Sequence, residues 1–138
     1  MNRERVTAAI RVRYQETDQM AVAWHGHYVT WFEMARTEWW REQGQSYREL
    51  ELSGILLPVL GVQVRFHARA HFDDLLHVDV GLQSYQGVRL VFNYNVTRPV
   101  DEKCIAEGTT EHTFVDREFN VIRLQRRSPE VHQLLIVD

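Results

Sequence analysis

Hydrophobic residues recur at helical spacing between Tyr28 and Trp39. The members of this stripe fall at i, i+3, i+4, i+7 and i+11: Tyr28, Trp31, Phe32, Ala35 and Trp39. Such spacing is typical of a helix that buries one face. Charged residues lie largely off the stripe, namely Arg36, Glu38, Arg41 and Glu42. Because helices often end at a residue that tolerates positive φ, Gly44 is the predicted stop of one long helix.

Elsewhere hydrophobic and polar positions alternate with a period of two, which indicates strands with one buried face. The alternation predicts strands at residues 6–14, 62–72, 76–83, 88–96 and 103–115, and a short strand at 119–124. Turn signals separate some of them, at Asp73-Asp74 and Gln86-Gly87. Residues 45–54 predict a short helical turn and a connector, and Ser128-Pro129-Glu130 has the residue types that begin a terminal helix.

The order of these elements is one strand, one long helix, and then four or five strands joined by short turns. Successive hairpins predict an antiparallel sheet, and so an α+β fold in a single domain, residues 1–138. One helix must cover the apolar face of the whole sheet, so we expect the sheet to curl around it. Its edge strands would stay exposed, which predicts a dimer at least, with edges paired across a two-fold axis.

Composition narrows the class of protein. The chain is 44% hydrophobic and 25% charged, as expected of a folded globular protein, and a net charge of −3 argues against a dedicated nucleic-acid binder. The single cysteine, Cys104, excludes an internal disulfide and fits a reducing compartment. Residues 1–6 are polar and no apolar run approaches the ~18 residues of a membrane span, so we expect a cytoplasmic protein with no secretion signal.

A polar loop carrying Asp18 and His25 leads directly into the start of the long helix. Unpaired N–H groups and the positive end of the helix dipole gather there, which suits chemistry on a carbonyl group. Each residue also has a structural alternative. Asp18 has the position of a helix cap or an Asx turn, His25 that of a surface or capping residue, and Tyr14 that of a core residue at the inward end of the first strand.

Two segments resemble a known family. The first contains Arg13-Tyr14, Glu16-Thr17-Asp18, Val22, His25, Tyr28, Trp31-Phe32-Glu33 and Ala35-Arg36, and the second contains Phe66 to Ala70 with Phe72-Asp73-Asp74-Leu75. In both, the chain resembles the 4-hydroxybenzoyl-CoA thioesterase family of acyl-CoA hydrolases. The resemblance implies the hotdog fold, a curved antiparallel sheet wrapped around one long central helix. Two positions depart from the family pattern: His27 stands where Asn is usual, and Arg69 where Pro is usual.

The resemblance also implies site residues for the hydrolysis of a thioester. Asp18 would act as nucleophile or as general base, with His25 and Tyr14 shaping the site. Backbone amides at Gly26, His27 and Tyr28 would polarise the thioester carbonyl, and Trp24 would line the acyl group, whether aryl or aliphatic. Glu33, inside the helix, is a second candidate carboxylate, although a solvated or partner-facing role is its simpler interpretation.

Arginines on the polar faces of strands are candidates for the phosphates of coenzyme A, chiefly Arg65, Arg69 and Arg89, with a solvated or subunit-facing surface as the alternative. The sequence predicts no cofactor and no metal site. His67 and His71 share a strand face but lie ~13 Å apart at the strand rise, too far to share an ion. Cys104 is interpreted as structural.

The resulting hypothesis is an acyl-CoA thioesterase that releases free acid and CoA, assembled as a dimer or as a homotetramer built of two dimers. An acyl-carrier-protein thioesterase is the first alternative, in which a carrier protein presents the acyl group. A hotdog hydratase is less favoured because its His and Asp/Glu arrangement is missing. A non-catalytic acyl-CoA binding module belongs to a different class, and the presence of Asp18 argues against it.

Overall fold

The computed structural model describes residues 5–136. The polar residues 1–4, part of the segment for which the sequence predicts no secretion signal, lie outside that range. In chain order the elements are β1 (Val6–Arg11), the 3₁₀ turn η1 (Tyr14–Glu16), α1 (His27–Glu42), α2 (Tyr47–Leu52), β2 (Val59–Phe66), β3 (Leu75–Tyr85), β4 (Arg89–Arg98), β5 (Lys103–Thr113), α3 (Leu124–Arg127) and α4 (Pro129–Ile136). No helix among the described residues is long and apolar enough to cross a membrane.

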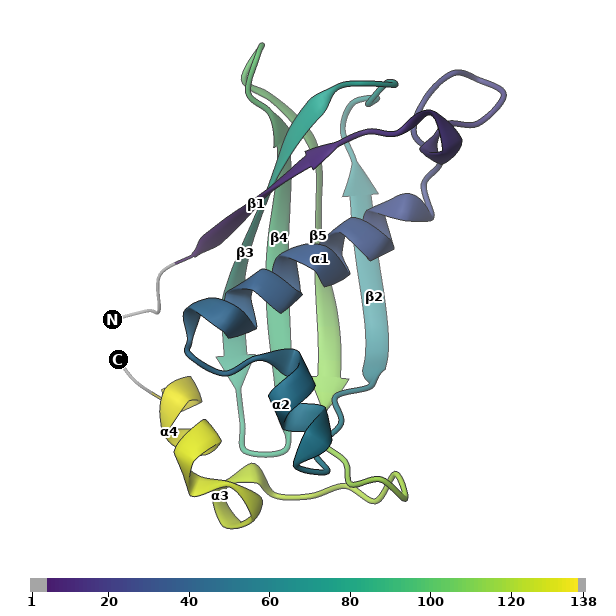
Figure 1. The fold of residues 1–138 in the computed structure, drawn as a ribbon. Coiled ribbons are helices and arrows are strands. Elements are labelled where there is room, and N and C mark those ends of the chain that lie inside the picture. Colours follow the sequence, from purple (N-terminus) through teal and green to yellow (C-terminus); the bar gives the residue numbers. More distant parts are fainter. Residues whose placement is uncertain (1–4, 137–138) are drawn as a thin grey trace.

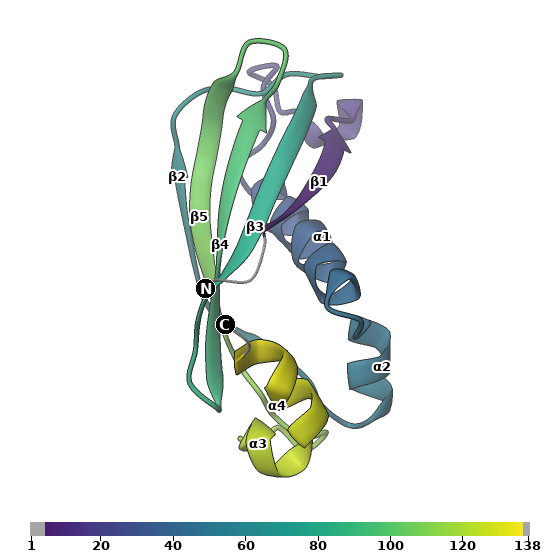
Figure 2. The same ribbon diagram turned by 90° about the vertical axis from the view of Figure 1, so that its left-hand side faces the viewer.

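The strands form one antiparallel sheet in the order β1-β3-β4-β5-β2. Strands β3, β4 and β5 follow one another through hairpins, as predicted. The prediction of a hairpin between β2 and β3 is wrong, because β2 pairs with β5 and the chain crosses to β3 through residues 67–74. Figure 1 shows α1 lying diagonally across this sheet, and Figure 2 shows helix and sheet as two layers with the sheet curved toward the helix.

The predicted aromatic stripe of α1 fills the space between the two layers. All its members are buried at 2% exposure or less: Tyr28, Trp31, Phe32, Ala35 and Trp39. Phe32 stacks on Tyr94 of β4, with 4.1 Å between ring centroids. Its ring passes directly over Gly108 of β5, where a Cβ would lie 2.8 Å from the ring. Burying side chains of this size stabilises the fold by roughly 2–3 kcal/mol each.

The end of α1 is also as predicted, with Gly44 at φ +84° just beyond Glu42. Arg36 differs from the prediction, because it is buried at 6% exposure although its spacing placed it largely off the stripe. Its Nη1 donates to Tyr94 Oη at 3.1 Å, and Tyr94 Oη shares a hydrogen bond with Thr110. Thr110 Oγ1 in turn lies 2.8 Å from His112 Nε2. A chain of polar groups therefore runs through the core from α1 to β5.

Two predicted strands end earlier than predicted, and a third predicted strand does not form. The first strand ends at Arg11, because the chain turns into η1, and Tyr14 is 76% exposed rather than a core residue. Strand β2 ends at Phe66, because the next two amides both turn to the carbonyl of Ile105. In the segment 119–124 the structure has a single bridge, Val121 to Val115, and α3 begins at Leu124. Helix α4 does begin at Pro129, as predicted.

Candidate functional site

The loop between β1 and α1 is fixed to the helix by Glu16. This side chain is buried at 3% exposure, and its Oε2 accepts a 3.1 Å hydrogen bond from Trp31 Nε1 in the middle of α1. Its Oε1 accepts the backbone N–H of Arg13 at 2.8 Å, and its own carbonyl accepts the N–H of Trp24 at 2.8 Å. One residue therefore holds the beginning of the loop, the end of the loop and the helix together.

Opposing effects act on the pKa of the Glu16 carboxyl. Burial is the largest and raises the pKa, but the hydrogen bonds from the Arg13 backbone and from Trp31, with the charge of Arg13, outweigh it together and leave the pKa below its ordinary value. Glu16 is therefore ionised and fully used in holding the loop. The sequence signal for it was its place in the Glu16-Thr17-Asp18 motif, but its burial cannot be read from local spacing.

Asp18 lies at the beginning of a tight turn closed by the bridge between Thr17 and Ala23. Its Oδ1 accepts the N–H of Met20 at 2.8 Å, which is the Asx-turn role that the sequence left open. The backbone N–H of Asp18 donates to the carbonyl of Val22, and the carbonyl of Asp18 accepts the N–H of Ala21, both at 2.9 Å. The side chain is half-buried, and its Oδ2 has no hydrogen-bond partner in the part of the chain that the structure describes. One carboxylate oxygen thus remains for a ligand.

The start of α1 gathers the other predicted residues. The amides of His27 and Tyr28 donate to the carbonyls of Trp24 and His25, at 3.0 and 3.3 Å. The Gly26 amide donates no hydrogen bond within residues 5–136, so it is an unpaired donor at this helix start. Gly26 caps the helix without a side-chain partner, and a Cβ at this position would overlap the ring of Trp24.

Aromatic rings cluster at this helix start. The indole of Trp24 lies 4.8 Å from the imidazole of His25 and 5.5 Å from that of His27, and Trp24 and His25 are exposed. Tyr28 is buried beneath, 4.9 Å from the ring of Phe66 at the end of β2. Burial raises the pKa of Tyr28 to about 12, so its hydroxyl is protonated at neutral pH. Tyr14 lies outside this group and packs edge-on against Phe72 at 5.6 Å.

The crossover segment 67–74 supports the loop from the other side. The carbonyl of Ala70 accepts the N–H of Ala23 at 2.8 Å. Arg98 of β4 holds the segment with a 2.9 Å ion pair to Asp74 and a 3.1 Å hydrogen bond to the carbonyl of Arg69. Site loop, helix start and crossover therefore form one connected region at the end of the sheet where α1 begins (Figure 1).

The three predicted phosphate-binding arginines are not brought together within this chain. Arg89 is the first residue of β4, at the other end of the sheet, and pairs with Glu111 at 3.0 Å. Arg69 is exposed in the crossover. Arg65 of β2 lines a polar hollow of about 870 Å³ on the sheet face opposite α1, with Arg5, Asn93 and Asn95. This hollow is separate from the Asp18 loop. Within the described residues, His67, Cys104 and Glu107 form the one group of side chains suited to hold a metal.

Comparison with known proteins agrees with this arrangement. The sequence profile described as the thioesterase-like superfamily matches residues 12–133. Over 124 residues the chain is 32% identical to the putative acyl-CoA thioesterase YneP of Bacillus subtilis, covering 89% of each protein. It is also 33% identical over 87 residues to the acyl-CoA thioester hydrolase YbgC of Escherichia coli O6:H1, covering 63% of this chain and 65% of that one.

The fold is equally close to solved structures. The crystal structure of a DHNA-CoA thioesterase from Staphylococcus aureus superimposes with a TM-score of 0.91 at 31% identity, over 94% of this chain and 87% of that one. With a curved five-stranded sheet around α1 and a family match over most of its length, the chain belongs to the thioesterase-like superfamily and has the hotdog fold.

Proposed function

We propose that the protein is an acyl-CoA thioesterase that hydrolyses an aryl or aliphatic acyl-CoA to the free acid and CoA. The observation that carries the proposal is the unpaired Gly26 amide at the start of α1, beside a loop that presents Asp18 and is fixed to the same helix by Glu16. An amide with no partner can donate to the oxygen of a thioester as negative charge develops on it. Trp24 and Tyr28 would line the acyl group.

The chemistry of Asp18 follows one of two courses. As a nucleophile, its Oδ2 attacks the thioester carbon, CoA leaves as a thiolate, and water then hydrolyses the mixed anhydride. As a general base, it takes a proton from water while the water oxygen attacks and the thiolate leaves. Both mechanisms use Oδ2 of Asp18, the carboxylate oxygen that takes no part in the Asx turn. The exposed Arg65, in its large polar hollow, is our candidate for contact with a CoA phosphate.

The test compares wild type with Asp18→Ala and Asp18→Asn on a panel of acyl-CoA esters, with release of free thiol as the readout. We expect kcat to fall by about 10²–10⁴ in both variants. Glu33→Gln is the matched control, because Glu33 is an exposed carboxylate on α1. Undiminished turnover in both Asp18 variants removes Asp18 from the mechanism, and loss of turnover in Glu33→Gln assigns the role to Glu33. Tight binding of acyl-CoA by wild type with no thiol released would make the protein a binding module.

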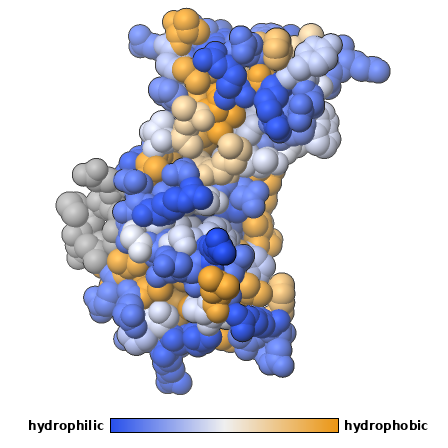
Figure 3. Space-filling view, viewed as in Figure 1, coloured by the Kyte–Doolittle hydropathy of each residue, from blue (hydrophilic) through white to orange (hydrophobic). Residues whose placement is uncertain are grey.

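We also propose that the protein is a homodimer paired through β2. This strand is an edge of the sheet, yet its apolar side chains are half-exposed: Val59 45%, Leu60 49%, Val62 41% and Phe66 46%. Figure 3 shows hydrophobic surface along the side of the molecule where β2 runs. An uncovered apolar edge strand is a template for pairing, whereas β1, the other edge, follows the charged Arg5 and ends at the charged Arg11. The single cysteine fits a reducing compartment, and we place the reaction in the cytoplasm.

A further inference from the structure

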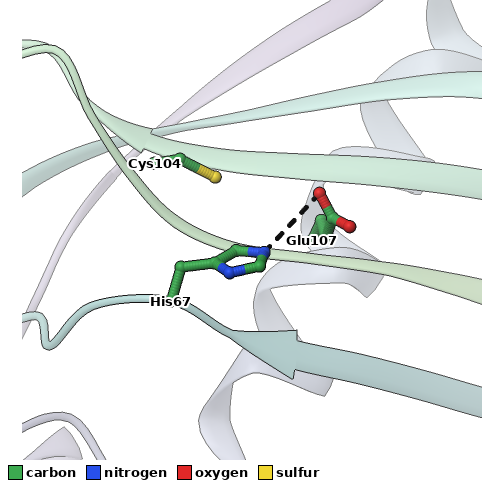
Figure 4. A group of neighbouring side chains, drawn as sticks. All are labelled: His67, Cys104 and Glu107. Atoms are coloured by element: carbon green, nitrogen blue, oxygen red, sulfur yellow. Dashed lines mark ion pairs between the residues drawn. The ribbon is translucent and has the colours of Figure 1, made fainter.

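Three side chains with metal-binding groups meet on the sheet face opposite α1. His67 follows the end of β2, and Cys104 and Glu107 belong to β5 (Figure 4). His67 Nε2 lies 3.6 Å from Glu107 Oε2, and the ligand atoms of all three residues lie within 4.8 Å of one another. We propose that these three residues form a binding site for a divalent transition metal of the Zn²⁺ class.

A β-bulge brings the three together. In β5, Ala106 pairs with Val96 but Cys104 pairs with Thr97, so Ile105 is an extra residue in the strand. Residues three apart in a regular strand point to opposite faces. The bulge turns Cys104 to the outer face with Glu107, while Ile105 and Ala106 are both buried against the helix side. The Ile105 carbonyl also accepts the N–H of His67 at 2.8 Å. The same irregular residue therefore positions all three side chains.

The donor set fits zinc. Thiolate, imidazole and carboxylate are its usual protein ligands, at bond lengths that place tetrahedral ligand atoms roughly 3.3–3.7 Å apart. The 3.6 Å between His67 and Glu107 already has this spacing. Cys104 is exposed and its thiol makes only a 4.0 Å contact with the carbonyl of Ala106 within the described residues, so its side chain is free to rotate toward the other two ligands. Arg65 lies opposite Glu107 in the register, but the two form no ion pair within residues 5–136. Metal binding would release the thiol proton to solvent and leave the fourth position to water.

The site is tested on the full purified chain, stripped with a chelator and titrated with Co²⁺ as a spectroscopic probe and with Zn²⁺ in competition. We expect one Co²⁺ per chain with the absorption of a thiolate–cobalt bond, abolished in Cys104→Ser. His67→Ala and Glu107→Gln should weaken the Kd at least tenfold. His77→Ala and Glu111→Gln are matched controls on the same sheet face and should bind within twofold of wild type. A wild-type complex without the thiolate band, or equal loss in the controls, would overturn the proposal.

A second measurement does not depend on the absorption of the cobalt complex. Cys104 is the only cysteine, so its rate of alkylation by iodoacetamide reports on this site alone. Zn²⁺ at a concentration just sufficient to saturate wild type should slow the reaction at least tenfold in wild type and in both controls, and should slow it much less in Glu107→Gln, whose weaker site is then mostly empty. Equal rates with and without Zn²⁺ in wild type would also overturn the proposal. Circular dichroism of each variant checks that the exposed substitutions leave the fold intact.

Discussion

The indole N–H of Trp31 donates a 3.1 Å hydrogen bond to the buried carboxylate of Glu16. This contact joins the middle of α1 to the loop that carries Asp18. Because Glu16 also accepts from the Arg13 backbone and its carbonyl accepts from Trp24, the position of the loop depends on the pair. In the proposed mechanism Glu16 is thus a positioning residue, which would act on the reaction through Asp18 and the start of α1.

Trp31→Phe should therefore lower both stability and activity. The substitution keeps an aromatic ring but leaves a buried carboxylate oxygen short of a donor, at a cost of about 1–3 kcal/mol. Trp40→Phe is the matched control, because Trp40 is equally buried and its indole N–H has no partner among the described residues. The difference between the two variants in urea unfolding isolates the hydrogen bond. We expect kcat for acyl-CoA to fall about tenfold in Trp31→Phe alone, and equal losses in the two variants would contradict the positioning role.

Gly26→Ala should change substrate binding more than stability. The backbone at Gly26 has φ −67° and ψ −23°, which alanine adopts freely, so only the ring of Trp24 opposes a Cβ there. Trp24 is 47% exposed and can swing away, so we expect unfolding free energy to change by about 0.5 kcal/mol or less. If Trp24 lines the acyl group, KM rises severalfold. Trp24→Ala alone and the double variant complete a cycle, in which Gly26→Ala should have no further effect once Trp24 is absent.

The sequence was sufficient for the elements whose pattern is local. The stripe from Tyr28 to Trp39, the stop at Gly44 and the hairpin at Gln86-Gly87 each depend on neighbours a few residues apart, and all are confirmed. The pairing of β2 with β5 joins strands far apart in the sequence. The prediction that successive strands form hairpins therefore paired β2 with β3, which is wrong. Apolar alternation in β2 was also misleading as a sign of burial, because an edge strand beyond the helix leaves Val62 and Phe66 half-exposed.

The same limit applies to side chains with chemistry. The distance between His67 and His71 along one predicted strand argued against a metal site there. In the structure, His67 instead meets Cys104 and Glu107, which are far from it in the sequence, and their meeting depends on a bulge at Ile105. The spacing of Arg36 places it largely off the aromatic stripe of α1, yet the side chain is buried. Its burial depends on a hydrogen bond to Tyr94 that no spacing rule contains.

His112 should make stability fall in mild acid. Burial, with the charge of Arg36, lowers the pKa of His112 to about 4, against 6.5 for an unperturbed histidine. Above pH 6.5 neither the folded nor the unfolded chain protonates it, and between 6.5 and 4 only the unfolded chain does. The unfolding free energy therefore keeps its full value above pH 6.5. It falls by about 3 kcal/mol as the pH drops from 6.5 to 4. Urea unfolding across this range should show the slope, which His112→Gln removes and His77→Gln keeps.

Arg36→Met tests the buried charge directly. None of the ion pairs among residues 5–136 includes Arg36, and its Nε has no hydrogen-bond partner there. Replacing an unpaired buried cation by an apolar side chain of similar length removes a desolvation cost, so the unfolding free energy at pH 7 should be no lower than that of wild type. The pKa of His112 should rise toward its ordinary value, as measured by NMR titration. A strongly destabilised variant would show that the hydrogen bond from Arg36 to Tyr94 outweighs the desolvation cost of the buried charge.

Val62→Lys should break the proposed dimer. Val62 is 41% exposed on β2, and a lysine there would place a charge on the apolar surface that pairing would cover. Light scattering of wild type should give a mass of two chains, or four if two dimers associate, and Val62→Lys should shift it toward one chain at equal concentration. Ala9→Lys is the matched control on β1, the other edge strand, where an exposed alanine lies two residues before the charged Arg11. A monomeric wild type would refute pairing through β2, and loss of assembly in Ala9→Lys alone would move the interface to β1.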